Sequence, residues 1–183
     1  RHGGIFIVGF GPSSRMVARS LMGHGLKPEV IELNPASVKA ARAMGLRVHL
    51  GDASNMEILA HAGVTGSCVI VVTVPDPRSA KRILQNVHAL SPAAGVIVRS
   101  RYNISTMDLW ELGAAFVVDE ENVVGLEIAR QVIEFLKESD PETVTCALPP
   151  DATIRPAPVS ISVAGPAGGD AGVVAYSLPS AWT

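Results

Sequence analysis

Six short runs of apolar residues, rich in Val and Ile, alternate along the chain with segments whose apolar residues recur at helical spacing. The runs are continuous rather than interleaved with polar residues, which is typical of parallel strands covered on both faces. We therefore expect an α/β fold with helices on both sides of a parallel sheet. The expected strands are residues 5–10, 29–33, 46–50, 68–74, 95–100 and 114–118.

Residues that begin and end helices stand between these strands. Asn34-Pro35 and Asp76-Pro77 each place an N-cap side chain before a proline, which favours the first position of a helix. Gly45 follows a helical pattern, where a C-terminal cap is expected. Six strands and six helices with right-handed crossovers predict a Rossmann-like, doubly wound parallel sheet in the order 3-2-1-4-5-6. Ligands should gather at the carboxyl ends of strands one and four.

The last expected helix, roughly residues 120–137, is apolar over more than one face. Such a helix needs a second surface to bury it, and a twofold partner is the simplest source, so we expect a homodimer through this helix. The alternative is deep packing under the C-terminal residues. Residues 1–140 are expected to form one domain, and residues 141–183 a Pro/Gly-rich extension with short strands at 159–164 and 173–178.

Composition narrows the possible partners. The formal net charge is −2 and the Lys and Arg residues are scattered, which argues against a nucleic-acid partner. No apolar run approaches the roughly 20 residues that cross a bilayer. The two Cys and five His residues form no metal-binding pattern. Because the sequence begins with Arg1, only a few residues before the first strand, we interpret it as a piece of a longer protein.

The first strand ends in a glycine pair, Gly9 and Gly11, at the place where such folds turn toward a phosphate. Glu32 ends the second strand about 20 residues later, where an acidic side chain accepts hydrogen bonds from a ribose diol. The alternative is an ordinary tight turn and a solvated strand end. Spacing and context together favour a nucleotide site.

Three residues after the glycines modify this turn. Ser14 occupies the third glycine position, which serves helix-to-strand packing. Pro12 lacks an N–H and removes one donor, although it also favours a helix start. The hydroxyls of Ser13 and Ser14 would either replace that donor or cap the helix.

The residues after Glu32 bear on the kind of nucleotide. No Arg follows it to neutralise a 2′-phosphate, so NAD(H), AMP, ADP or ATP is expected before NADP. The sequence contains no GxSxG, HExxH or P-loop lysine, which favours a binding module over an enzyme.

An ordered series of motifs resembles one family. The chain contains, in order, VGFGPSSRMVARSL, VIELNP, GDAS, VIVVTVPDP, VIVRSRY and LGAAFVVDEENVVGLEIA. This series, over about residues 5–136, is similar to the TrkA-N or RCK domain that regulates potassium transport, and most similar to the cytosolic domain of Kef-type cation/proton antiporters.

The resemblance implies a regulatory domain that follows a membrane antiporter in the same chain, on the cytoplasmic face of the inner membrane. It implies an adenine nucleotide or dinucleotide as ligand, NAD(H) or AMP/ATP, and a homodimer formed partly by the last helix. The alternatives are the cofactor domain of an NAD-dependent dehydrogenase and a separate soluble subunit of a channel or transporter.

Carried over by position, the resemblance also implies site residues. Those expected at the phosphates are Gly9, Gly11, Pro12 and Ser13, with Glu32 at the ribose. Those expected around the rest of the ligand are Asp52 and Ala53 at the adenine, Thr73, Asp76, Arg99 and Glu120. We add Ser14 and Asn34, which adjoin these positions, to the candidates. The alternatives are helix caps for Asp52 and Asp76, a strand residue for Thr73 and a surface ion pair for Arg99.

Overall fold

The structure is a computed structural model that describes residues 4–67, 69–102, 105–138, 160–161 and 174–175. The chain divides into two units, Arg1–Glu121 and Asn122–Thr183, which are described separately. The first unit contains the sheet and the candidate site.

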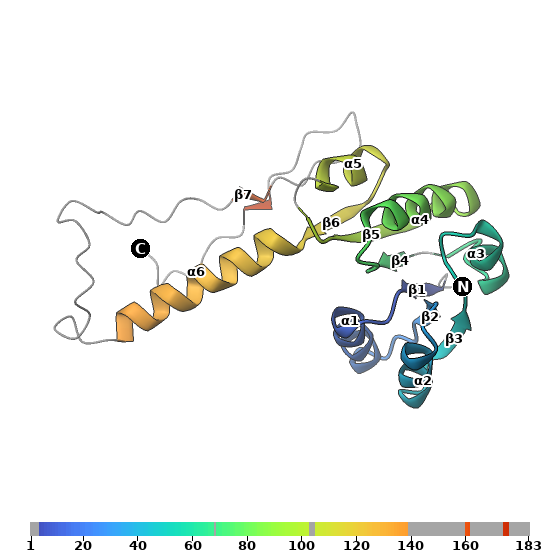
Figure 1. Ribbon diagram of the computed structural model, residues 1–183, viewed down its shortest axis with the longest axis horizontal. Coiled ribbons are helices and arrows are strands. Elements are labelled where there is room, and N and C mark those ends of the chain that lie inside the picture. The colour runs from blue at the N-terminus through green and yellow to red at the C-terminus, as the bar shows by residue number, and fades with distance from the viewer. Residues whose placement is uncertain (1–3, 68, 103–104, 139–159, 162–173, 176–183) are drawn as a thin grey trace. The chain divides into compact units, whose positions relative to one another are not determined.

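In the first unit, six parallel strands form one sheet in the order β3-β2-β1-β4-β5-β6, which confirms the expected topology (Figure 1). The strands are β1 (Ile5–Val8), β2 (Glu29–Glu32), β3 (Arg47–Leu50), β4 (Val69–Val72), β5 (Gly95–Ser100) and β6 (Phe116–Asp119). The helices between them are α1 (Pro12–Gly23), α2 (Pro35–Ala43), α3 (Met56–Ala62), α4 (Pro77–Leu90) and α5 (Thr106–Glu111).

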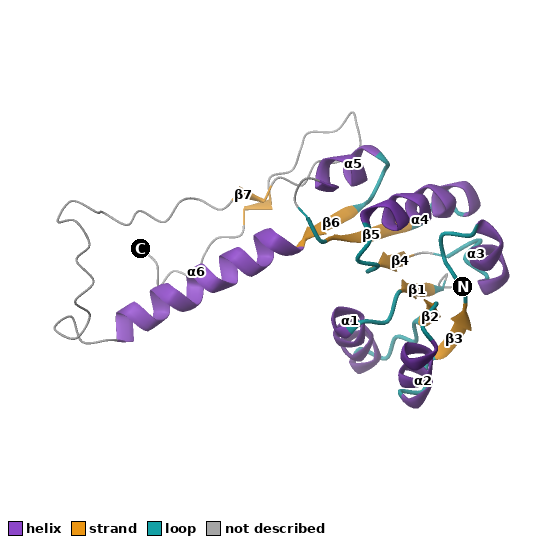
Figure 2. Ribbon diagram, viewed as in Figure 1, coloured by secondary structure: helices purple, strands orange, loops and turns teal. Residues whose placement is uncertain are grey.

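The helices cover the sheet in two layers, with α1 and α2 on one face and α3, α4 and α5 on the other (Figure 2). Each face has its own core. Ile7, Phe10 and Val30 pack against α1 and α2, whereas Phe6, Val8 and Ile70 belong to the cluster that α3, α4 and α5 complete. Neighbouring residues of β1 thus bury their side chains on opposite faces, which is why the strands are apolar without interruption.

Most expected strands were too long at their ends. Residues 5–10 shorten to Ile5–Val8, because Gly9 turns the chain with a φ of +88°. Residues 114–118 shift to Phe116–Asp119, because the N–H of Ala114 still bonds to the Leu109 carbonyl and closes α5. Cys68, in the expected strand 68–74, lies outside the described residues. The expected caps are present: Asn34 and Asp76 accept N–H groups of α2 and α4, and Gly45 follows α2 with a φ of +79°.

Helix α6 (Glu120–Glu138) begins directly after β6 and continues into the second unit. Large apolar side chains along its second-unit part are exposed: Val123, Val124, Leu126, Ile128, Val132, Phe135 and Leu136. Beyond it, β7 (Ser160–Ile161) and β8 (Val174–Ala175) pair antiparallel and lie within the two expected short strands. Among the described residues, no helix is both long and apolar enough to cross a membrane.

Candidate functional site

The two glycines after β1 differ in what the fold requires of them. Gly9 has a φ of +88°, and a Cβ there would lie 3.0 Å from the Thr73 hydroxyl oxygen, so the chain itself demands glycine. Gly11 has a φ of −76° and a ψ of −172°, which any residue adopts, and no described residue other than its chain neighbours lies within 4 Å of its Cβ position. The tight turn therefore requires glycine at Gly9 and not at Gly11. Gly11 faces open space.

Helix α1 begins beside that open space, and no described side chain caps its N-terminus. Gly11 is the N-cap, no side chain caps the helix, and Pro12 is its first residue. The N–H groups of Gly11, Ser13 and Ser14 have no partner within the helix at such a terminus. The first turn carries no acidic residue. Free N–H groups at the positive end of a helix are suited to an anion.

The hydroxyl of Ser14 points into the protein. It lies 2.6 Å from the Thr73 hydroxyl oxygen, and both residues are buried. Because the Thr73 hydroxyl donates its one hydrogen to the Val8 carbonyl at 2.9 Å, Ser14 must be the donor to Thr73. Ser14 thus packs α1 onto the ends of β1 and β4, the task of the third glycine position, and its hydroxyl neither caps the helix nor faces the open space.

Glu32 is fixed next to the glycine turn. Its carboxylate accepts the N–H of Phe10 at 2.6 Å and the N–H of Asn34 at 2.7 Å. Phe10 is the residue between the two glycines, so the carboxylate lies against the turn itself. The two oxygens keep further acceptor sites, which a ribose diol could use. Phe10 was not singled out from the sequence, since its contribution is a backbone N–H that any residue supplies.

Two further candidates, Asn34 and Ala53, are engaged within the fold. The Asn34 side-chain oxygen accepts the N–H of Ala36 at 2.8 Å and caps α2. Ala53 is buried in the core cluster, so only its backbone remains for a ligand.

Asp52 and Asp76 make the contacts of turn and cap residues. Asp52 accepts both the N–H and the hydroxyl of Ser54, at 2.9 and 2.6 Å. Asp76 accepts the N–H and hydroxyl of Ser79, both at 2.8 Å. These hydrogen bonds, from the serine hydroxyl first, hold the pKa of each carboxyl below its ordinary value.

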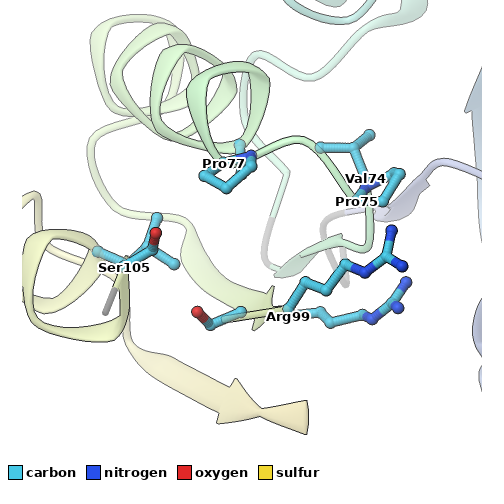
Figure 3. A pocket seen from close by; sticks show the side chains of 9 residues that line it. Val74, Pro75, Pro77, Arg99 and Ser105 are labelled. Atoms are coloured by element: carbon cyan, nitrogen blue, oxygen red, sulfur yellow. The ribbon is translucent and has the colours of Figure 1, made fainter. Parts of the chain in front are cut away.

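Arg99 connects the ends of three elements. Its Nε donates to the Glu120 carboxylate at 2.8 Å, its Nη2 donates to the same oxygen, and its Nη1 donates to the Thr73 carbonyl at 3.3 Å. A small hollow beside Arg99 lies between the loop after β4 and α5, with Val74, Pro75 and Ser105 among its lining residues (Figure 3). Arg99 and Glu120 therefore form the ion pair that was the alternative for Arg99.

The candidates gather at the carboxyl edge of the sheet, in two groups that meet at Thr73. The glycine turn, Ser14 and Glu32 surround the end of β1, whereas Arg99 and Glu120 join the ends of β5 and β6. Thr73 bonds to the first group through its hydroxyl and to the second through its carbonyl. The end of β1 beside β4 is the point where the strand order reverses, and such sheets bind ligands there.

The topology and the turn define the class of the protein, a Rossmann-like α/β domain with a nucleotide-type glycine turn. Comparison with known families is more specific. The TrkA-N domain family model matches residues 5–120, and the chain belongs to this family of TrkA-N, or RCK, domains.

Solved structures share the fold. The TrkA-N domain of the inner membrane protein YbaL from Escherichia coli is 29% identical with a TM-score of 0.65, over 74% of this chain and 98% of that chain. The Kef C-terminal domain of Shewanella denitrificans in AMP-bound form is 20% identical with a TM-score of 0.66, over 74% and 82%. The GsuK channel bound to NAD is 21% identical with a TM-score of 0.63, over 68% of this chain and 23% of that chain.

The different surroundings of the two glycines lead to different expected costs of substitution. Gly9→Ala should lower the free energy of unfolding by about 2 kcal/mol or more, because it adds left-handed strain and crowds the Thr73 hydroxyl. Gly11→Ala should cost less than about 1 kcal/mol, since its backbone is ordinary and its Cβ position is open. Urea denaturation measures both. An equal decrease in the free energy of unfolding for the two variants would contradict the difference between Gly9 and Gly11.

Proposed function

We propose that this chain is the nucleotide-sensing regulatory domain of a Kef-type potassium efflux (cation/proton) antiporter. The observation that carries the proposal is the open space at Gly11, bounded by the uncapped N-terminus of α1 and adjoined by the turn to which Glu32 is bonded. A phosphate at the helix N-terminus and a ribose at the carboxylate would occupy these features together. The membrane antiporter domain would belong to the same full-length chain, with this domain on the cytoplasmic face of the inner membrane.

The bound forms of related structures support an adenine nucleotide as the ligand. GsuK has been solved with NAD and with ADP, and the Kef C-terminal domain with AMP. All three ligands share an adenosine with at least one 5′-phosphate. We propose that NAD(H) or an adenine mononucleotide occupies the glycine turn here, bound as a signal rather than used in a reaction.

The open reading frame around this chain distinguishes the antiporter from its alternatives. About ten or more hydrophobic spans upstream would support the antiporter. A soluble catalytic domain would indicate a dehydrogenase instead, and neither would indicate a separate regulatory subunit.

Nucleotide binding should stabilise the domain against heat. AMP, ADP, ATP or NADH at about 100 times its Kd should add about 2.7 kcal/mol, a rise in Tm of several degrees. Gly11→Val should remove this shift, because its side chain fills the open space while its extended backbone suits valine. Differential scanning fluorimetry measures both proteins, with the unliganded Tm of Gly11→Val as the control for folding. No shift of the unsubstituted protein with any of these nucleotides would contradict the proposed function.

The role of Glu32 can be separated from its structural bonds with a ligand lacking one hydroxyl. If the carboxylate binds the ribose diol, Glu32→Gln should weaken AMP binding by about 1–3 kcal/mol. The same substitution should change the affinity for 2′-deoxy-AMP much less, because one hydroxyl is already missing. Isothermal titration calorimetry gives both affinities. Equal losses for the two ligands would place the effect in the turn that Glu32 supports through Phe10.

We further propose that two copies assemble through α6. Val124, Ile128, Val132 and Leu136 recur every four residues, so they line one side of the helix, and all four are exposed. An apolar stripe of this kind is stabilised when a second copy covers it. Nucleotide binding would regulate transport by favouring one dimer geometry over another.

Dimerisation should depend on the apolar stripe. Ile128→Glu places a charge in it and should yield monomers, whereas Glu134→Gln changes the charge by one unit at an exposed position on the opposite side of the helix and should leave dimers. Light scattering after size exclusion should give about twice the chain mass for the unsubstituted protein and for Glu134→Gln. A monomeric unsubstituted protein, or a dimeric Ile128→Glu protein, would remove α6 as the interface.

A further inference from the structure

Arg15, in the first turns of α1, is a basic residue that the fold leaves incompletely satisfied. Its Nε is buried and has no hydrogen-bond partner among the described residues. Its guanidinium carbon lies 5.9 Å from the centroid of the Phe10 ring, a cation–π contact with the residue between the two glycines. A buried N–H without a partner costs free energy, so packing alone does not explain the position of this side chain. Because Arg15 as a whole is half-buried, a ligand would contact its terminal nitrogens rather than the buried Nε.

The position of Arg15 is also electrostatically unfavourable without an anion. A cation near the N-terminus of a helix is repelled by the positive end of the helix dipole. Neither the first turn of α1 nor its cap offers a carboxylate. The Glu32 carboxylate lies against the turn, but its described hydrogen bonds are to the N–H groups of Phe10 and Asn34 and not to Arg15. A bound anion would give the guanidinium a hydrogen-bond acceptor, and its negative charge would offset the repulsion between Arg15 and the positive end of the helix.

Pro12 is the reason why a cation would be useful at this helix terminus. The helix terminus lacks one N–H at this residue, so a phosphate there meets fewer backbone donors. A guanidinium carries five N–H donors and a full charge, and it is suited to phosphate oxygens. Among the other arginines of this edge, Arg99 is already paired with Glu120, and Arg101 contacts the Tyr102 ring.

We propose that Arg15 binds the 5′-phosphate of the nucleotide at the N-terminus of α1 and replaces the donor lost at Pro12. This inference rests on the proposed nucleotide site. It makes Arg15 a specificity-determining residue that distinguishes phosphorylated ligands from the nucleoside. Adenosine shares the base and ribose contacts of AMP but offers nothing to the guanidinium.

The test is calorimetric titration of the 183-residue chain with AMP and with adenosine. Arg15→Gln should weaken AMP binding about tenfold or more, the scale of a charge-assisted hydrogen bond, and leave adenosine binding unchanged. Arg15→Lys keeps the charge and the cation–π contact and should retain more AMP affinity than Arg15→Gln. Arg19→Gln is the matched control, because it removes the same charge one turn further along α1 from an exposed position.

Restoring the missing donor provides a second measurement. Pro12→Ala returns an N–H to the helix terminus, so it should recover part of the AMP affinity lost in Arg15→Gln. AMP affinity unchanged in Arg15→Gln, or AMP and adenosine weakened by the same factor, would overturn the role of Arg15 while leaving the nucleotide site in place. An unsubstituted chain that binds neither AMP nor adenosine would instead overturn the site, and the inference with it.

Discussion

The hydroxyl of Thr73 is the contact on which the glycine turn depends. It accepts a hydrogen bond from Ser14 and donates one to the Val8 carbonyl, and both hydroxyl groups are buried. A buried hydroxyl without a partner costs roughly 1–3 kcal/mol, so α1, β1 and β4 are held at one spacing. The same oxygen lies 3.0 Å from the Cβ position of Gly9, which therefore has to be glycine. The conformation of the turn is thus determined by Ser14 and Thr73, whose buried hydroxyls face away from the open space at Gly11.

This arrangement separates the residues that build the site from those left over for a ligand. Gly9, Ser14 and Thr73 are required by the chain's own packing and would be needed with no ligand at all. Three features serve no such purpose among the described residues: Gly11, the N–H groups at the start of α1 that have no partner within the helix, and the Arg15 guanidinium, whose Nε makes no hydrogen bond to a described residue. Features that the fold does not explain are the stronger guide to function, because packing alone would not select them.

The position of the site, inferred from glycines at a strand end, stays a prediction. The sequence predicted the sheet order well, since that order follows from strands buried on two faces. It predicted the strand ends poorly, because each end depends on the carbonyl to which a backbone N–H donates. The N–H of Ala114, for example, donates to the Leu109 carbonyl, so Ala114 does not join β6. The pairing of Ser14 with Thr73 joins residues 59 positions apart, and no local pattern encodes it. Asp52 and Asp76 fit a cap and a ligand contact equally well by residue type, and only the bonds to Ser54 and Ser79 show their use in the fold.

Regulation requires that a ligand at the turn affect a distant element, and the described contacts offer a route. The carbonyl of Thr73 accepts a hydrogen bond from Arg99, which is paired with Glu120, the first residue of α6. The start of α1 is therefore joined to the start of α6 through two intermediate residues, Thr73 and Arg99. Such a path of contacts is not itself coupling, because coupling also needs an element with two states that the ligand biases. In the proposed function, the exposed apolar residues of α6 that follow Glu120 are the candidate for that element.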